Sequence, residues 1–81
     1  MIWNKNKDSL DKNLIGCNVV FNLNSGNTVK GTLLKLGIND VMVEALEIKA
    51  VSNDNFKPIT KNIIIPLTAI ETIEIEGGVL Q

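Results

Sequence analysis

Apolar residues of this chain recur at every second position from residue 17 onward, and this period limits the folds that the chain can adopt. Cys17, Val19, Phe21 and Leu23 fall on one face of an extended segment, while asparagines occupy three of the four positions between and after them. Successive side chains of a strand point to opposite faces, so the pattern is that of a half-buried strand. We therefore expect a first strand over residues 17–24.

Four further extended runs follow, and turn-forming residues separate them. Asn-Ser-Gly-Asn at residues 24–27 leads into a second strand over 28–36, which predicts a hairpin, and Gly-Ile-Asn-Asp at 37–40 leads into a third strand over 41–48. A loop is expected over 50–60, a fourth strand over 61–66, a brief turn over 67–69 and a fifth strand over 70–76. Gly31, inside the second strand, predicts sharp bending or a close approach of another backbone.

The two ends of the chain differ from this pattern. Ser9 as a helix cap, Leu10 and Leu14 four residues apart, and the terminating Gly16 predict one short helix. Residues 1–8 are expected to form a flexible arm that docks on the barrel or on a neighbouring subunit, and residues 77–81 a loose tail. A short helix followed by five antiparallel strands is the order of a small SH3-like or OB-like barrel. We expect a mainly β, strongly bent sheet in a single domain, 1–81, with the barrel at 9–76.

Composition excludes several classes of function. Cys17 is the only cysteine and histidine is absent, which removes intramolecular disulfides, most transition-metal sites and histidine-based catalysis. The formal net charge is -1 and all eight basic residues are lysines, so binding of nucleic acid would be local and would not involve arginine forks on a duplex. No apolar run is long enough to span a bilayer. We expect a cytoplasmic, non-enzymatic protein with no cofactor, no metal and no membrane partner.

Three consecutive isoleucines, Ile63, Ile64 and Ile65, indicate self-assembly. In a strand they point to both faces, although a five-stranded barrel has only one interior, so something must cover the outer face. Pairing of the fourth strand with the fifth strand of a neighbour, through these residues together with Ile73 and Ile75, would do so and would generate a cyclic ring. The alternative is a monomer in which the N-terminal helix or the long loop covers the patch.

Two stretches resemble the two motifs of the Sm/LSm family. Residues 16–33 match the first motif through Gly16, the alternating valines, Gly26, Gly31 and Leu33, and residues 63–73 resemble the second motif in its bacterial Hfq form, through Ala69, Ile70, Thr72 and Ile73. The two stretches together contain 29 of the 81 residues and lie at the two ends of the region from residue 16 to 73. The resemblance implies an N-terminal helix on a bent five-stranded sheet, rings joined through the last two strands, and single-stranded RNA bound around a central pore.

The resemblance places the binding residues in two turns. Ile38 is expected to offer an apolar shelf for a base, Asn39 an amide that reads the base edge, and Asp40 an acceptor, with Leu67 and Thr68 lining the other side. The family's Asp is replaced by Gly37, and its basic residue after the fourth strand is missing. Gly-Ile-Asn-Asp is also simply a good turn.

Three lysines, Lys30, Lys35 and Lys61, are candidates for phosphate contacts, although each by itself fits a solvated strand face better. The leading hypothesis is a ring that binds single-stranded RNA, with single-stranded DNA a weaker candidate. The alternative is a ring that serves as a structural or protein-interaction scaffold and has lost nucleic-acid binding.

Overall fold

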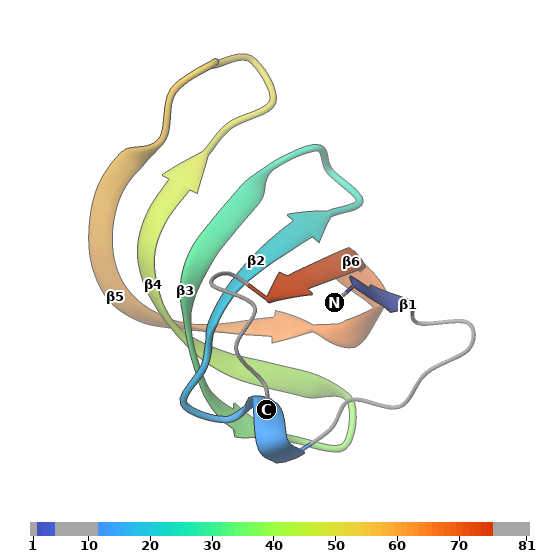
Figure 1. Ribbon diagram of the computed structural model, residues 1–81. Helices are drawn as coiled ribbons and strands as arrows, with labels where there is room; N and C mark the ends of the chain where they lie inside the picture. The colour runs from blue at the N-terminus through green and yellow to red at the C-terminus, as the bar shows by residue number, and fades with distance from the viewer. Residues whose placement is uncertain (1, 5–11, 76–81) are drawn as a thin grey trace.

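The described residues, 2–4 and 12–75, form one curled antiparallel sheet in the computed structural model (Figure 1). In chain order the elements are β1 (Ile2–Asn4), the 3-10 turn η1 (Lys12–Leu14), β2 (Asn18–Leu23), β3 (Thr28–Leu36), β4 (Asp40–Lys49), β5 (Lys57–Pro66), the 3-10 turn η2 (Leu67–Ala69) and β6 (Ile70–Ile75). The strands lie in the order β1-β6-β2-β3-β4-β5. The predicted mainly β fold with five bent antiparallel strands is confirmed in β2–β6, and β1 adds a short sixth strand.

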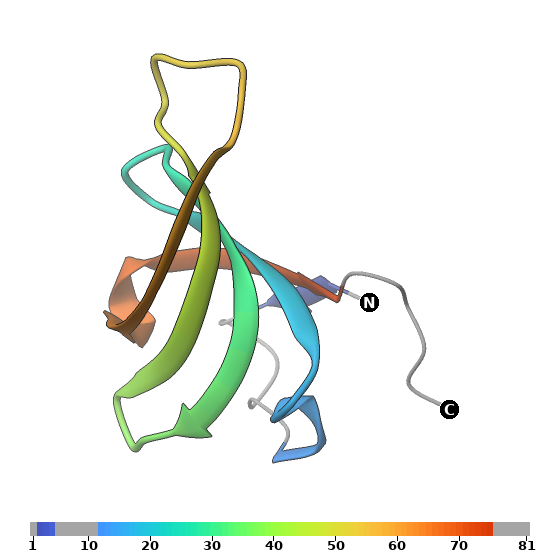
Figure 2. The ribbon, with the colours of Figure 1, turned by 90° about the vertical axis from the view of Figure 1, so that its left-hand side faces the viewer.

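Irregular pairing allows the sheet to bend. The register between β3 and β4 shifts at Lys30/Gly31 and again at Leu33/Lys35, and the register between β4 and β5 shifts at Ala45/Glu47. An extra residue on one strand bends that strand and increases its local twist. As Figure 2 shows, the long strands curve over and β6 runs crosswise to them, so that the sheet wraps around its own interior.

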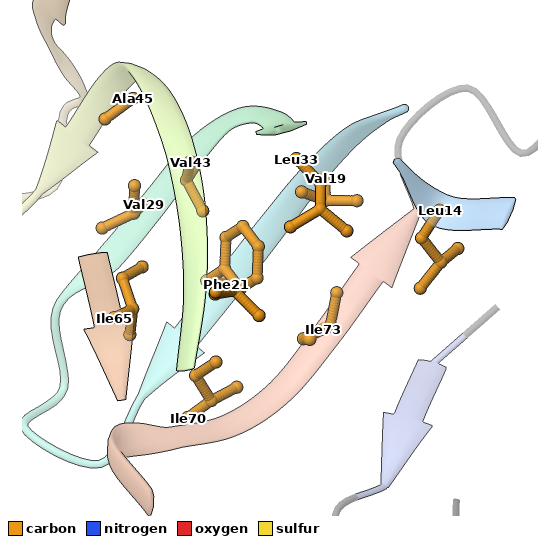
Figure 3. Close-up of a cluster of buried hydrophobic side chains, with 11 residues drawn as sticks. Leu14, Val19, Phe21, Val29, Leu33, Val43, Ala45, Ile65, Ile70 and Ile73 are labelled. Atoms are coloured by element: carbon orange, nitrogen blue, oxygen red, sulfur yellow. The ribbon is translucent and has the colours of Figure 1, made fainter. Parts of the chain in front are cut away.

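The interior is almost entirely aliphatic, and Phe21 is its one buried aromatic side chain among the described residues (Figure 3). Alternation explains its composition, since the inward positions of β2–β6 supply all the buried residues except Leu14, which comes from η1. These are Leu14, Val19, Phe21, Val29, Leu33, Val41, Val43, Ala45, Ile65, Ile70 and Ile73. Within the described part of the chain no buried side-chain nitrogen or oxygen lacks a hydrogen-bond partner. The core is therefore stabilised by burial of apolar surface.

The backbones of β3 and β4 approach each other closely at Gly31. A β-carbon at this position would collide with the carbonyl oxygen of Glu44 and would lie 3.0 Å from the Cα of Ala45. Both neighbours are backbone atoms of the adjacent strand, so they cannot rotate away. The close backbone approach predicted for Gly31 is confirmed.

The helix predicted over residues 9–16 is not found in the described part of that range, which contains only the three-residue turn η1. Gly16 donates its N–H to the carbonyl of Leu33 at 2.7 Å, and its φ of +89° turns the chain directly into β2. This contact with β3 ends the helical turn early, while Leu14 enters the core. Residues 9–11 lie outside the described residues.

Two further expectations need correction. The loop predicted over 50–60 is shorter, because β5 begins at Lys57 and includes Pro58 and Thr60. A proline is tolerated there since β5 lies at the edge of the sheet, where one side of the strand needs no backbone donor. Residues 2–4 form a strand that pairs with β6, so this part of the arm expected to be flexible docks on the sheet of its own chain, which is one of the two sites expected for it. The remainder of the arm and the tail 77–81 lie outside the described residues.

We expect Gly31→Ala to lower the free energy of unfolding by about 1–3 kcal/mol, because the added methyl group separates β3 from β4. Urea unfolding followed by circular dichroism measures the change. Lys35→Ala, at an exposed position on the same strand, serves as the control and should stay within about 0.5 kcal/mol of wild type. Equal stability of the two variants would contradict the close approach.

Candidate functional site

The turn between β3 and β4 displays the residues that the sequence assigns to base binding. Gly37 donates its N–H to the carbonyl of Asp40 at 2.8 Å, which closes the turn. Ile38, at its tip, is 93% exposed, and Asn39 and Asp40 are also exposed. A β-carbon at Gly37 would collide with the Asp40 carboxylate, so this carboxylate lies back against its own turn. The turn therefore presents an apolar side chain and an amide side by side at the surface.

The second predicted segment, η2, lies directly against this turn. Leu67 donates its N–H to the carbonyl of Asn39 at 2.9 Å, which joins two segments that are 28 positions apart in the chain. Thr68 is exposed next to this contact. Leu67 departs from the prediction, because its side chain packs on the core and only its backbone takes part in the site.

Asn24 is a member of this assembly that the sequence analysis treated only as a turn residue. Its backbone N–H donates to the carbonyl of Ala69 at 2.9 Å, and its Nδ2 donates to the carbonyl of Thr68 at 2.6 Å. These two bonds tether η2 to the β2–β3 turn. The two Asn24 bonds hold η2 against the β2–β3 turn, and the Leu67 bond holds it against the β3–β4 turn. These three hydrogen bonds set the position of Thr68 relative to Asn39.

We call the exposed residues of these two turns, Ile38, Asn39, Asp40 and Thr68, the turn surface. The three candidate phosphate contacts do not gather around it. Lys35 is exposed two residues before Gly37, at the same end of β3, whereas Lys30 lies five residues earlier, roughly 17 Å along the strand. Lys61 is exposed on β5. Only Lys35 is therefore adjacent to the turn surface along the chain.

Lys30 instead contacts an aromatic side chain that the sequence analysis did not single out. Its Nζ lies 4.2 Å from the ring centroid of Phe56, and the Nζ of Lys49 lies 5.9 Å from the same centroid. Both distances are within the range of cation–π attraction. No local sequence pattern predicts this cluster, because Phe56 lies in the loop between β4 and β5 and contacts β3 only in the folded chain.

The same loop is also attached at its other end. Val51 donates its N–H to the Oδ1 of Asn27 at 3.2 Å, and the Val51 side chain lies where a β-carbon on Gly26 would be, at 2.8 Å. The loop over residues 50–56 is thus fastened to the β2–β3 turn at its start and to the sheet through Phe56 at its end. We assign the lysine–Phe56 contacts a structural role in holding this loop.

The five isoleucines predicted to form an oligomer interface divide into two groups. Ile65 and Ile73 are buried in the core of the single chain and are not free for a second copy, whereas Ile63 and Ile75 are partly buried against the core. Alternation along the strand explains this, since Ile63 and Ile65 point inward. Ile64 points to the other face and is 61% exposed. Of the predicted interface side chains, Ile64 is the one that stays largely in solvent.

The described residues contain no cluster of three or more histidine, cysteine or carboxylate side chains that would hold a metal ion. Cys17 is a free, half-buried thiol whose sulfur lies 3.6 Å from the carbonyl of Asn13. None of the helical segments in the described chain has the length and apolar character required to cross a bilayer.

Comparison with known proteins identifies the fold. No protein-family model and no curated protein sequence matches the chain. A chain in the crystal structure of the NatC complex bound to CoA is similar to it, with a TM-score of 0.68 over 86% of this chain and 90% of that chain and with 16% identical residues. The two chains share a fold, which here is a strongly bent antiparallel sheet. An identity this low concerns the fold alone and carries no activity from one protein to the other.

We expect Phe56→Ala to loosen the loop over 50–56 and to lower the free energy of unfolding by about 1 kcal/mol, because both lysine contacts are lost. Limited proteolysis at the loop and urea unfolding report the two effects. Phe56→Tyr keeps the ring and should behave as wild type. If alanine leaves both proteolysis and stability unchanged, the cluster does not hold the loop.

Proposed function

We propose that this protein is a member of the Sm/LSm family that binds single-stranded RNA at the turn surface and assembles into a ring. The hydrogen bond from Leu67 to Asn39 carries the proposal, because it places Ile38, Asn39 and Thr68 on one exposed surface. A base stacks on a flat or apolar side chain while an amide reads its edge. Ile38 offers the apolar contact, Asn39 the amide, and Lys35 a cation for phosphate.

The turn surface explains a preference for unpaired RNA. A side-chain amide reaches the Watson–Crick edge of a base only when that base is unstacked and unpaired. The chain carries no arginine and has a net charge of -1, so it has little attraction for the paired phosphate rows of a duplex. One such surface contacts a base through few groups, and several copies in a ring would raise the overall affinity through multivalency.

Two strands of opposite charge, β5 at one edge of the sheet and β6 next to the short β1 at the other, support assembly into a ring. No strand of the described residues pairs with the outer side of β5, which exposes Lys57 and Lys61 and contains no acidic residue. β6 exposes Glu71 and Glu74 and contains no basic residue. Contact between β5 of one copy and β6 of the next brings opposite charges together, whereas contact between two copies of β5 brings lysines together. A head-to-tail contact of this kind closes into a ring.

A scaffold that forms the same ring without binding RNA is the second candidate function. The observation that favours it is the scatter of Lys30, Lys35 and Lys61, which leaves a single lysine beside the turn surface. Both candidates are non-enzymatic, and neither requires a cofactor. We place the protein in the cytoplasm under both, where the RNA-binding candidate would find its ligand.

We expect Asn39→Ala to weaken binding of a short single-stranded RNA about tenfold, because the amide that reads the base is lost. Fluorescence anisotropy with oligo-U, oligo-A and the matching single-stranded DNA measures the affinity. Asn55→Ala, an exposed asparagine in the loop between β4 and β5, is the matched control and should bind as wild type. Failure of wild type to bind any of these oligonucleotides would reject the RNA proposal in favour of the scaffold.

Assembly has a separate test based on charge reversal. Replacing Lys57 and Lys61 by glutamate should raise the dissociation constant of the oligomer about tenfold or more, because both edges then carry negative charge. Replacing Glu71 and Glu74 by lysine in the same chain should restore assembly, since every interface then joins two reversed edges. Sedimentation velocity without RNA gives the constants.

The control for this test reverses two exposed lysines away from β5, Lys12 and Lys35, and changes the net charge by the same amount. It should assemble as wild type. If the fourfold variant remains as weak as the β5 variant, the oppositely charged edges do not meet.

A further inference from the structure

β6 is paired on both of its sides in the single chain. One side pairs with β2 along the whole strand, from Val19↔Ile75 to Leu23↔Ile70. The other side pairs antiparallel with β1, with Ile2 opposite Glu74, Trp3 opposite Ile73 and Asn4 opposite Thr72. In Figure 1, β1 lies alongside β6 at the edge of the curled sheet. The edge that a neighbouring β5 would need is therefore already occupied by the chain's own N-terminal segment.

The two strands would compete for the same backbone groups. A strand edge offers each N–H and C=O once, so residues 72–74 cannot pair with β1 and with a second copy's β5 at the same time. The part of β5 that would enter is regular, because residues 61–66 pair with β4 without a register shift. Both strands are thus able to occupy the edge, and only one can do so.

The competition is uneven in two respects. β1 pairs with three residues of β6, while the entering segment 61–66 of β5 is long enough to pair with all six. β1 also carries no cation opposite the two glutamates of β6, since its residues are Ile2, Trp3 and Asn4, whereas β5 carries Lys61 in the entering segment and Lys57 just before it. On the other side, β1 belongs to the same chain, so its effective concentration at the edge is high.

We propose that β1 is an exchangeable strand that covers the β6 edge of the free chain and leaves it when β5 of a second copy docks. The inference rests on the proposed self-assembly and adds a way in which that assembly is regulated. At low protein concentration the intramolecular strand prevails and protects an edge that would otherwise recruit strands without selectivity. Above a threshold concentration the longer, charge-matched β5 replaces it.

The first test breaks the pairing of β1 in the full-length chain. Successive N–H groups of a strand point to opposite sides, so one of the two N–H groups of Trp3 and Asn4 points toward β6. The double variant Trp3→Pro/Asn4→Pro removes both donors and disfavours the strand. We expect its oligomer to form at a concentration about tenfold lower than that of wild type, measured by sedimentation velocity over a dilution series.

The control Trp3→Ala/Asn4→Ala removes the same side chains and keeps the N–H groups. It should assemble within about threefold of wild type, since backbone pairing with β6 is retained. If the proline variant assembles at the same or a higher concentration than wild type while wild type forms oligomers, exchange of β1 is wrong and self-assembly stands. If no variant assembles at any concentration, the proposed ring fails together with the exchange.

A second variant tests the opposite direction and does not depend on weakening the fold. Asn4 and Thr72 are directly opposite each other, so cysteines at both positions are close enough to form a disulfide that locks β1 onto β6. Cys17→Ala in the same chain prevents mispairing with the existing thiol. We expect the oxidised protein to remain monomeric and the reduced protein to assemble as wild type. Equal assembly of the two forms would overturn the proposal.

Discussion

The close approach of β3 and β4 at Gly31 is the constraint on which the rest of this structure depends. The carbonyl of Glu44 passes where any other residue would place its β-carbon, so the two strands curve together only because this side chain is absent. Register shifts on both sides of the contact complete the bend. The bend carries β6 across the sheet and brings Ile70 and Ile73 into the interior with Phe21. Without it the aliphatic residues would line one face of an open sheet and remain in water.

The same curl brings together turns that are far apart in the chain. Asn24, Asn39 and Leu67 belong to three separate connections, and backbone hydrogen bonds join them once β2, β4 and β6 are wound around one core. The edges of the sheet are a further product of the curl. Because the barrel does not close by pairing β5 with β6, one chain retains an unpaired basic edge and an acidic edge that β1 covers over only three residues. The turn surface and the charged strands at the two ends of the sheet thus have one common origin in the bent sheet.

How much of this could be predicted depends on whether a feature is local. The two-residue period located β2, β3 and β4 within one residue at nearly every boundary, since alternation directly reports which side chains face the core. The prediction of a helix over 9–16 was wrong for the described residues of that range. The hydrogen bond from Gly16 to Leu33 redirects the chain there, and local sequence signals for a helix carry no information about such a distant contact. Pro58 falls in the loop expected over 50–60 but lies in an edge strand, where a missing backbone donor has no cost. Phe56 escaped notice because its partners lie on β3 and at the end of β4.

By itself, the sequence determined the strand pattern, the aliphatic core, the need for glycine at position 31 and the exclusion of histidine-based catalysis. Those properties follow from side-chain size, charge and the two-residue repeat, which act between near neighbours in the chain. Only the tertiary structure decided that Leu67 supports the site through its backbone, that Ile64 alone of the three consecutive isoleucines stays exposed, and that β1 takes the edge of β6. These are contacts between segments distant in sequence, and they depend on the angle and register at which the strands wind around the core.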